Sequence, residues 1–380
     1  MRDRWPSAYY VLNTLHQAGY KAYVVGGAVR DHLLGLPCKD LDVATDALPE
    51  QVMDLFHKTF ATGIAHGTVT VVHEEPIEVT TFRVESEYVD KRRPSEVQFV
   101  RELRQDLARR DFTINAMALS KEEELVDYFD GQLDLQKKQI RAVGIAEERF
   151  EEDALRILRG IRFAAQLSFT IEATTLEAMK SKSHLLTFIA KERVKQEVSQ
   201  IWLFQNPEIA LSELKKTYMD ASLPGSYSVL PVRHKPFQMS AHGWAWFHFF
   251  QKDPYTFPYS NNEKRLNAEV KRLIPLLAAN GWSYHSVFNF SKDALVVAHE
   301  IMMDESKFVS LSDLDVWLEQ APIRHLEELA LSGTELMKLT GLKAGPWIKQ
   351  VKHQLADEIL GERLENSQSA LEKWVNEHVK

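Results

Sequence analysis

The spacing of hydrophobic residues changes near residue 146. Before it, short β-branched runs such as 66–73 and 77–84 alternate with brief helical patterns, which predicts strands mixed with short helices. After it, apolar residues recur at helical spacing in segments such as 147–169 and 347–360. We therefore expect an α+β fold, in which an N-terminal head with a small mixed β-sheet is followed by an all-α remainder.

The first 45 residues show how the head begins. The pattern predicts, in order, a helix (5–18), a strand (21–25), a turn (Gly26 and Gly27), a short helix (28–35) and a second strand (40–45). Further along, the aromatic and proline-rich stretch 223–260 is interpreted as an irregular connection.

Composition and charge narrow the class of protein. With 380 residues, 44% hydrophobic and 26% charged, the chain is long enough for two or more globular units. A single cysteine, Cys38, excludes a disulfide framework and favours a reducing, cytoplasmic location. The first residues lack an apolar signal core and no apolar run reaches membrane-spanning length, so we expect no membrane association. The net charge of −8 argues against a nucleic-acid partner, although 90–111 and 136–141 are locally basic.

Asp40 and Asp42 are the first candidates for chemistry. Residues i and i+2 of a strand point to the same face, so we expect the two carboxylates side by side on a buried strand. Like charges so placed share either a proton or a cation. Mg²⁺ is the hard cation that carboxylates and substrate phosphates hold together. Two aspartates on a solvated strand are the alternative interpretation.

The turn before these aspartates is suited to binding a phosphate group. Gly26 and Gly27 lead into the N-terminus of the helix 28–35, whose free N–H groups attract anions. Arg30 lies one turn further on. Phosphate donors beside metal ligands are what a nucleoside triphosphate requires.

The segment 109–116 adds a pair of arginines followed by an aspartate. Arg110 can contact a phosphate or a ribose. Asp111 is either a functional group or merely the N-cap of a helix that begins at Phe112.

The segment 152–162 is a helical pattern rich in arginine. Asp153 and Arg156 are three residues apart and neighbours on a helix surface, which is also the spacing of an ordinary salt bridge. Arg156, Arg159 and Arg162 recur every third residue in an otherwise apolar helix and cannot share one solvated face. Their spacing favours arginines placed around a ligand.

These segments resemble class II CCA-adding tRNA nucleotidyltransferases, in the DNA polymerase beta nucleotidyltransferase superfamily. The motifs that carry the resemblance lie within 22–165 and are GGAVRDHLLG…KDLDVAT, RRDFTINA, DYFDGQLDL and EDALRILRGIRFA, with a weaker match in GLKAGPWIKQ and GERLEN. The resemblance implies a seahorse-like molecule with a nucleotidyltransferase head and a helical neck, body and tail. The limits we expect are 1–146 (catalytic head), 147–205 (neck with the nucleotide-selecting helix), 206–310 (body) and 311–380 (tRNA-binding tail).

The resemblance also implies an activity, which is template-independent addition and repair of the 3′-terminal CCA of tRNA. CTP and ATP would be the substrates, pyrophosphate would be released, and tRNA would bind through its acceptor stem and upper half. Mg²⁺ ions would be held by Asp40 and Asp42, with Glu78 as a weaker third carboxylate. The sequence leaves open whether the protein is a monomer or a homodimer.

Roles around the nucleotide follow from the same resemblance. It assigns Gly27 and Arg30 to the triphosphate, Arg110 to the sugar and phosphates, Asp111 to a ribose hydroxyl, Arg159 and Arg162 to support of the nucleotide, and Asp153 with Arg156 to the base. Hydrogen-bond chemistry supports the last pair. Cytosine and adenine both present an amine donor beside a ring-nitrogen acceptor, which suits a carboxylate next to a guanidinium. Uracil and guanine present a carbonyl beside an N–H instead, and each mismatch costs about 1–3 kcal/mol.

Other functions compete with this one. A bacterial poly(A) polymerase shares the head motifs, but GIAHGTVTVV after the second strand is similar to the CCA-adding version. Enzymes that add only CC typically lack part of the loop that this chain keeps at 84–97, whereas an enzyme that adds only A can retain it. A non-catalytic tRNA-binding module is the least favoured, because Asp40, Asp42 and Arg110 are all present.

Overall fold

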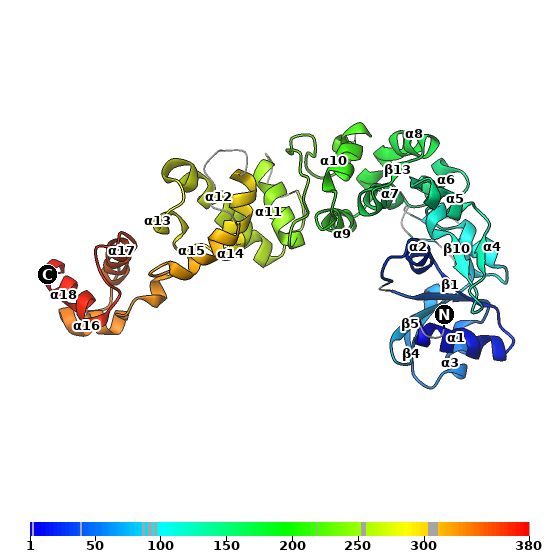
Figure 1. The fold of residues 1–380 in the computed structure, drawn as a ribbon, viewed down its shortest axis with the longest axis horizontal. Coiled ribbons are helices and arrows are strands. Elements are labelled where there is room, and N and C mark those ends of the chain that lie inside the picture. Colours follow the sequence, from blue (N-terminus) through cyan, green and yellow to red (C-terminus); the bar gives the residue numbers. More distant parts are fainter. Residues whose placement is uncertain are drawn as a thin grey trace. The chain divides into compact units, whose positions relative to one another are not determined.

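A computed structural model describes the chain except for residues 2–3, 39, 86–87, 90–92, 95–96, 218, 252–255, 303–310 and 380. The chain forms two compact units, Met1–Phe237 and Gln238–Lys380, which we call unit 1 and unit 2 (Figure 1). This division falls inside the range 206–310 expected for the body. The four domain limits expected from the sequence stay predictions.

Unit 1 contains the mixed sheet that the sequence predicts (Figure 1). Among the described residues, seven strands form it in the order β11-β10-β1-β2-β5-β4-β3. Their bounds are β1 (Ala22–Val25), β2 (Asp42–Thr45), β3 (Thr59–Gly63), β4 (Thr68–Val72), β5 (Pro76–Thr81), β10 (Met117–Leu119) and β11 (Leu125–Asp127). β2 and β5 run parallel, and the other neighbouring strands run antiparallel. Alternation along β4 and β5 sends Val69, Val71, Ile77 and Val79 into the core.

Short helices surround this sheet. They are α1 (Pro6–Gln17), α2 (Gly27–Leu33), α3 (Pro49–Leu55), α4 (Leu103–Ala108) and α5 (Gly131–Gln136), with the 3₁₀ turns η1 (Ile64–His66) and η2 (Thr113–Asn115). α1 packs against β1, β2 and β5, and α3 packs against β4 and β5 (Figure 1). One core cluster includes Val25, Ala44 and Phe82 and connects the sheet to Leu103 and Leu107 of α4.

Two short strand pairs lie between β5 and α4. β6 (Arg83–Glu85) pairs with β9 (Val97–Phe99), and β7 (Tyr88–Val89) pairs with β8 (Arg93–Pro94), both antiparallel. This is the loop 84–97, on which the distinction between CC-adding and A-adding enzymes rests. Much of it, 86–87, 90–92 and 95–96, lies outside the described residues.

Helices complete unit 1. They are α6 (Ala146–Glu152), α7 (Leu155–Leu167), α8 (Ala173–Lys182), α9 (Lys191–Ile201) and α10 (Pro207–Lys216), with η3 (Ser183–Phe188), η4 (Met219–Ala221) and the parallel pair β12 (Gln139–Ile140) and β13 (Thr170–Ile171). Gly160 lets α7 approach its neighbours closely, because a Cβ there would lie 2.8 Å from the Phe112 ring and would overlap Cε of Met179.

The segment 147–169, interpreted as one helical run, is two helices. Asp153, between α6 and α7, has extended backbone angles of φ −143° and ψ 102°. Its Oδ1 accepts a hydrogen bond from the N–H of Leu155 at 3.0 Å. The break therefore gives α7 a first turn of its own, directly after Asp153.

The regular elements in the described part of unit 2 are all helical. They are α11 (Ser240–Phe250), α12 (Asn261–Asn280), α13 (Tyr284–Val287), α14 (Lys292–Met302), α15 (Leu311–Gln320), η5 (Leu326–Glu328), α16 (Gly333–Thr340), α17 (Trp347–Leu360) and α18 (Gln368–His378). The interpretation of 223–260 as irregular is wrong where α11 lies. Trp244, Trp246 and Phe247 are buried there, and a helix that is apolar on nearly every side shows no amphipathic period. Within the ranges given above, no helix is both long and apolar enough to cross a bilayer.

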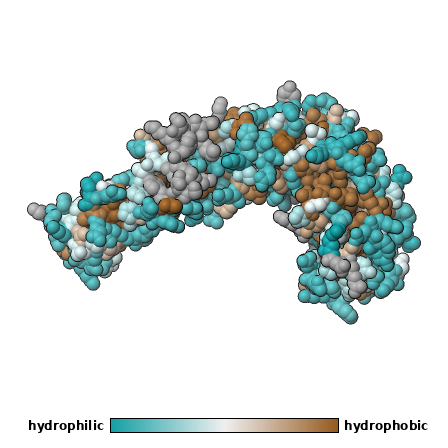
Figure 2. Space-filling model, viewed as in Figure 1, coloured by the Kyte–Doolittle hydropathy of each residue, from teal (hydrophilic) through white to brown (hydrophobic). Residues whose placement is uncertain are grey.

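One part of the surface of unit 1 is more hydrophobic than the rest in the view of Figure 2. Figure 2 shows hydrophobic residues gathered over the region that holds α5 and α7. Leu133 on α5 and Ile145 just before α6 are 44% and 60% exposed. Most of the other surface visible in this view is hydrophilic.

Candidate active site

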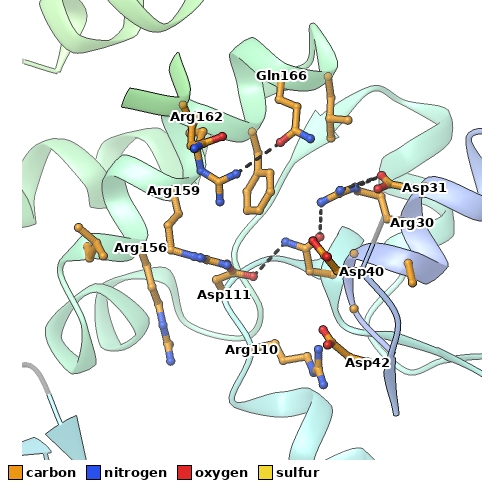
Figure 3. Close-up of a pocket in the computed structure, with 18 of the residues that line it drawn as sticks. Arg30, Asp31, Asp40, Asp42, Arg110, Asp111, Arg156, Arg159, Arg162 and Gln166 are labelled. Atoms are coloured by element: carbon orange, nitrogen blue, oxygen red, sulfur yellow. Dashed lines mark hydrogen bonds and ion pairs between the residues drawn. The ribbon is translucent and has the colours of Figure 1, made fainter. Parts of the chain in front are cut away.

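One cavity of unit 1 collects most of the residues singled out from the sequence. It has a volume of about 960 Å³ and is walled by the turn after β1, the start of β2, the segment between α4 and η2, and helices α7 and α9. The expected residues that line it are Gly27, Arg30, Asp40, Asp42, Arg110, Asp111, Asp153, Arg156, Arg159 and Arg162. In Figure 3, Asp40 and Asp42 lie across the cavity from the arginines of α7. The structure brings these residues together, and the role of each stays a prediction.

Strand register builds the carboxylate end of the cavity. Asp42, the first residue of β2, lies opposite Val25 at the end of β1 and beside Glu78 on the parallel strand β5. The expectation that Asp40 and Asp42 both lie on a buried strand is wrong, because Asp40 precedes β2 and both residues are exposed. Both carboxylates nevertheless line the same cavity. β2 starts only at Asp42 because its partner β1 ends at Val25 and gives way to the glycine turn.

The surroundings of Asp42 suit a bound cation. Partial enclosure raises the pKa of Asp42, and the negative charges of Glu78 and Asp40 raise it further against the opposing effect of Arg110. Repulsion among carboxylates is relieved by a hard divalent ion. In the part of the chain that the structure describes, no group of three or more His, Cys, Asp or Glu side chains is arranged for a metal. The donor set therefore fits an ion that takes two carboxylates from the protein and its remaining ligands from substrate phosphates and water.

The turn after β1 brings guanidinium groups to the same end. Gly26 has φ of +74°, a backbone conformation that favours glycine, and a Cβ there would lie 2.8 Å from Nη1 of Arg110, so the guanidinium could not keep its present place beside a larger residue. Arg30 is 4% exposed, and its Nη1 donates to Oδ1 of Asn115 at 2.9 Å. Gly27 and Arg30 thus stand close to the carboxylate end, where the sequence places a triphosphate.

Asp111 lies at the centre of a hydrogen-bond network. The interpretation of Asp111 as a helix N-cap is wrong, because the segment is a single 3₁₀ turn whose N-cap residue is Phe112. Oδ1 of Asp111 accepts from the N–H of Phe112 (2.8 Å) and from Nδ2 of Asn115 (3.1 Å), and Oδ2 accepts from Nε of Arg159 (2.8 Å). Burial would raise the pKa of Asp111, but Arg159 and Asn115 outweigh it and bring the pKa to about 2. Asp111 is therefore an anion throughout the physiological range.

Helix α7 presents its arginines to the cavity (Figure 3). Nη2 of Arg159 lies 2.7 Å from Oδ2 of Asp111, and Nε of Arg162 lies 2.6 Å from Oε2 of Glu197 on α9. The charge of Asp111 raises the pKa of Arg159, whereas burial lowers the pKa of Arg162 in spite of Glu197. Both side chains stay cationic, as arginine does in proteins.

The ring of Phe163 lies among three of these cations. The guanidinium carbons of Arg30, Arg159 and Arg162 are 5.2, 5.5 and 4.2 Å from its centre. Phe163 is buried and packs edge-to-face against Phe112. Because the face of an aromatic ring attracts cations, Phe163 adds to the ion pairs with carboxylates that already hold these three like charges near one another.

Asp153 and Arg156 are not paired with each other on one helix face, contrary to the interpretation of their spacing. Asp153 stands in the break before α7, and its Oδ2 lies 2.9 Å from Nη2 of Arg193 on α9. Nη1 of Arg156 lies 2.7 Å from Oε2 of Glu152, and its Nη2 donates to the carbonyl of Arg109 at 3.0 Å. Both residues nevertheless line the cavity.

The structure adds site residues that sequence reasoning missed. Asn115, Phe163, Arg193 and Glu197 each contact a residue singled out from the sequence. Asn115 and Phe163 stand inside the motifs RRDFTINA and EDALRILRGIRFA, which carried the signal for them. Arg193 and Glu197 lie 40 and 35 positions from their partners, and no local pattern points to them.

Carboxylates beside a glycine turn, facing a helix rich in arginine, are the arrangement expected of a nucleotidyltransferase. Comparison of the sequence with models of known protein families supports this class. Residues 22–141 match the Poly A polymerase head domain. Residues 168–225 match the family described as probable RNA and SrmB-binding site of polymerase A, and residues 254–375 match tRNA nucleotidyltransferase domain 2.

Similarity to CCA-adding enzymes extends over the whole chain. The CCA-adding enzyme of Bacillus cytotoxicus is 37% identical over 391 residues, with 98% of each chain covered, and that of Bacillus cereus is 35% identical over 393 residues, with 99% of each covered. The crystal structure of the Bacillus stearothermophilus CCA-adding enzyme in complex with CTP superimposes with a TM-score of 0.85 at 31% identity, covering 99% of this chain and 98% of that one. The Thermotoga maritima CCA-adding enzyme complexed with tRNA shares the fold, with a TM-score of 0.68 at 20% identity over 97% and 94% of the two chains. The chain belongs to the family of CCA-adding enzymes.

This assignment confirms the resemblance stated from four short motifs, and with it the α+β fold class with a helical remainder. The protein is an enzyme of nucleotidyl transfer. Enzymes of this class depend on a divalent metal.

Proposed function

We propose that the protein adds and repairs the 3′-terminal CCA of tRNA, using CTP and ATP, releasing pyrophosphate and requiring no nucleic-acid template. The observation that carries this proposal is the cavity of unit 1, where two carboxylates, a glycine turn and the arginines of α7 face one another. Support comes from relatives that are named for this activity and from solved CCA-adding enzymes complexed with CTP, ATP or tRNA.

Asp40 and Asp42 would hold Mg²⁺ at the carboxylate end. Their oxygens are hard ligands, and the phosphates of the nucleotide would complete the coordination. Such ions, when bound, stabilise charge on the attacking and leaving oxygens of the transfer. Glu78, which does not line the cavity but lies in register with Asp42, would add negative charge from the neighbouring strand.

The turn after β1 and the arginine-rich segment would fix the triphosphate and the sugar. The backbone of Gly27 and the guanidinium groups of Arg30 and Arg110 supply donors for phosphate oxygens. Asp111 would accept a hydrogen bond from a ribose hydroxyl at Oδ2, the oxygen that it presents to Arg159. Arg159 and Arg162 would support the nucleotide from α7.

Asp153 and Arg156 would form hydrogen bonds to the edge of the base, and each is oriented by an ion pair with a neighbouring side chain. Glu152 holds Arg156, and Arg193 holds Asp153. A carboxylate has about four acceptor positions. In the residues described, Asp153 accepts from the Leu155 N–H and from two nitrogens of Arg193, which leaves a position for the amine of cytosine or adenine. These ion pairs orient the two groups and do not exclude a base.

The helical parts of the chain would bind the tRNA acceptor stem and upper half. Matches to an RNA-binding family over 168–225 and to a tRNA nucleotidyltransferase domain over 254–375 support this. The locally basic segments 90–111 and 136–141 would contribute positive charge toward phosphates. A tRNA substrate is in keeping with the expected cytoplasmic location.

Incorporation assays on tRNA transcripts test the proposal. One transcript ends before CCA and a second ends after CC, and each is incubated with labelled CTP, labelled ATP or both. A CCA-adding enzyme extends the first with CTP alone and completes it only when ATP is added. Extension of the second transcript only would identify an A-adding enzyme, and long AMP tails on either would identify a poly(A) polymerase. No incorporation with Mg²⁺ present would leave a non-catalytic tRNA-binding module.

A further inference from the structure

We propose that Asn115 is a positioning residue of the nucleotide site, whose side-chain amide bridges Arg30 and Asp111 and so directs the carboxylate that accepts the ribose hydroxyl. This inference rests on the proposed function, because it concerns how the triphosphate and ribose groups are held. Asn115 is 6% exposed and lines the cavity.

The bridge consists of two hydrogen bonds of opposite sense. Nη1 of Arg30 donates to Oδ1 of Asn115 at 2.9 Å, and Nδ2 of Asn115 donates to Oδ1 of Asp111 at 3.1 Å. The amide cannot be turned around, because its NH₂ group would then face a guanidinium and its oxygen a carboxylate. An uncharged amide can accept from a cation and donate to an anion at the same time, which neither an ionised carboxylate nor an apolar side chain can do.

This bridge sets the direction of the Asp111 carboxylate. The N–H of Phe112 and the amide of Asn115 both reach Oδ1, so Oδ2 is turned toward Arg159. On the other side, the bridge ties Asp111 to Arg30, which lies 85 positions from Asn115 in the sequence. The groups proposed for the sugar and for the triphosphate are thereby held at a constant separation.

Charges on all sides make the amide difficult to replace. The charged groups that face Asn115 or Asp111 are Arg30 and Asp31 from α2 and Arg156 and Arg159 from α7. A carboxylate at position 115 would stand beside Asp111 at hydrogen-bond distance. Two carboxylates so close cannot both ionise without a penalty, so one of them takes up a proton at a raised pKa.

The near-isosteric variants Asn115→Asp and Asn115→Leu test the bridge by pH. The measurement is kcat/KM for CTP on tRNA that lacks CCA, between about pH 6 and pH 9. Above the raised pKa, Asn115→Asp has two repelling carboxylates, and we expect kcat/KM about 10- to 100-fold below that of the unmodified protein. Below it, the added proton restores a donor toward Asp111 and a carbonyl acceptor for Arg30. Activity of Asn115→Asp relative to Asn115→Leu should therefore rise about tenfold as the pH falls, because Asn115→Leu makes neither hydrogen bond at any pH.

A comparison of CTP with dCTP, which lacks the 2′-hydroxyl of the ribose, provides a second measurement. A misdirected Asp111 should harm CTP more than dCTP, so the ratio of their kcat/KM values should fall about tenfold in Asn115→Leu at every pH, and in Asn115→Asp only at high pH. If Asn115→Asp does not fold, Asn115→Ser, smaller and uncharged, provides the same test through this ratio. Equal losses for CTP and dCTP at every pH would overturn the proposal and leave Asn115 a structural residue. An unmodified protein that adds no CMP fails the proposed function itself, whereas one that adds CMP without preferring CTP to dCTP refutes only the ribose role and the bridge with it.

Discussion

The two units of this chain bury different kinds of polar side chain. In unit 1 the buried charged residues are Arg30, Asp106, Asp111, Asp134, Arg156, Glu197 and Arg233. In unit 2 the buried polar residues are His242, Asn267, Ser286 and His299, so no Asp, Glu, Lys or Arg is buried among the residues described there. Its packing depends on aliphatic and aromatic clusters such as the one around Leu336, Leu355 and Leu371.

This difference places the groups capable of chemistry in unit 1 and leaves unit 2 with a mainly apolar core. A buried charge is costly unless it is paired, and the charges of unit 1 have partners, such as Arg109 for Asp106 and Arg141 for Asp134. Those near the cavity are also the groups proposed to hold the nucleotide. Unit 1 therefore gains its function from buried, paired charges, whereas the packing of unit 2 depends mainly on apolar side chains.

The largest expected effect concerns Asp42, whose replacement should abolish activity without lowering stability. We expect Asp42→Asn to reduce both CMP and AMP incorporation by about 10³-fold or more, because charge stabilisation by bound metal is worth several kcal/mol. The pKa of Asp42 is raised in the folded protein, so the loss of its charge should not lower the melting temperature. Asp54→Asn, at an exposed position of α3 that does not line the cavity, is the matched control. Incorporation by Asp42→Asn within tenfold of the control would remove Asp42 from the site.

In unit 2, replacement of a core residue should lower stability without changing the affinity for the nucleotide. Trp244 is fully buried and packs against Phe247, Phe257 and Tyr259. We expect Trp244→Ala to lower the free energy of unfolding of unit 2 by about 3–5 kcal/mol, measured by urea denaturation, and to leave the Kd for CTP unchanged. Val316→Ala, at a position that is 53% exposed, is the control. A weaker Kd for CTP in Trp244→Ala would show that the two units are not separate in this respect.

Asp153 tests selectivity within unit 1. Asp153→Ala removes the acceptor that opposes a carbonyl, so discrimination against UTP and GTP should fall about 10- to 100-fold. The measurement is kcat/KM for all four nucleoside triphosphates. Glu151→Ala is the matched control, since Glu151 is an exposed carboxylate of α6 that pairs with Lys182 and does not line the cavity. If Asp153→Ala slows every nucleotide equally, Asp153 serves only its ion pair with Arg193.

The smallest effect should be the acid dependence that Asp111 gives to the stability of unit 1. The pKa of Asp111 is about 2 in the folded protein and 3.8 ordinarily. A lowered folded-state pKa contributes stability above pH 3.8 that is lost as the pH falls toward 2, and the shift corresponds to about 2 kcal/mol. Asp111→Asn should therefore flatten the acid side of the unfolding profile of unit 1, measured between about pH 5 and pH 2. An unchanged acid profile would mean that the charge of Asp111 adds nothing to folding.

Local signals were enough to predict the head and most of the cavity wall. The β-branched runs that became β4 and β5 and the glycine turn before α2 are read from a few adjacent residues. Short motifs named ten of the residues that line the cavity, because each motif lies within one element or one turn.

What could not be predicted depends on residues far apart in the sequence. The apolar period runs through Phe150, Ile157 and Ile161 without interruption and so hides the break at Asp153. A local hydrogen bond from the Leu155 N–H to Asp153 contributes to the break, and so does an ion pair with Arg193, 40 positions away. Helix α11 could not be predicted for another reason. Its aromatic residues pack on several sides, so the sequence shows no polar face that would indicate a helix.

The missing side chain at Gly160 restricts how the site can move. Through it, α7 touches Phe112 of the head and Met179 of α8, both of which are fully buried. Swinging the helix away from either neighbour would bring these two side chains into water, at a cost of about 1.5–3 kcal/mol for each. We therefore expect the exchange of a cytosine for an adenine to proceed by rotation of side chains at the end of a stationary helix, rather than by displacement of the helix itself.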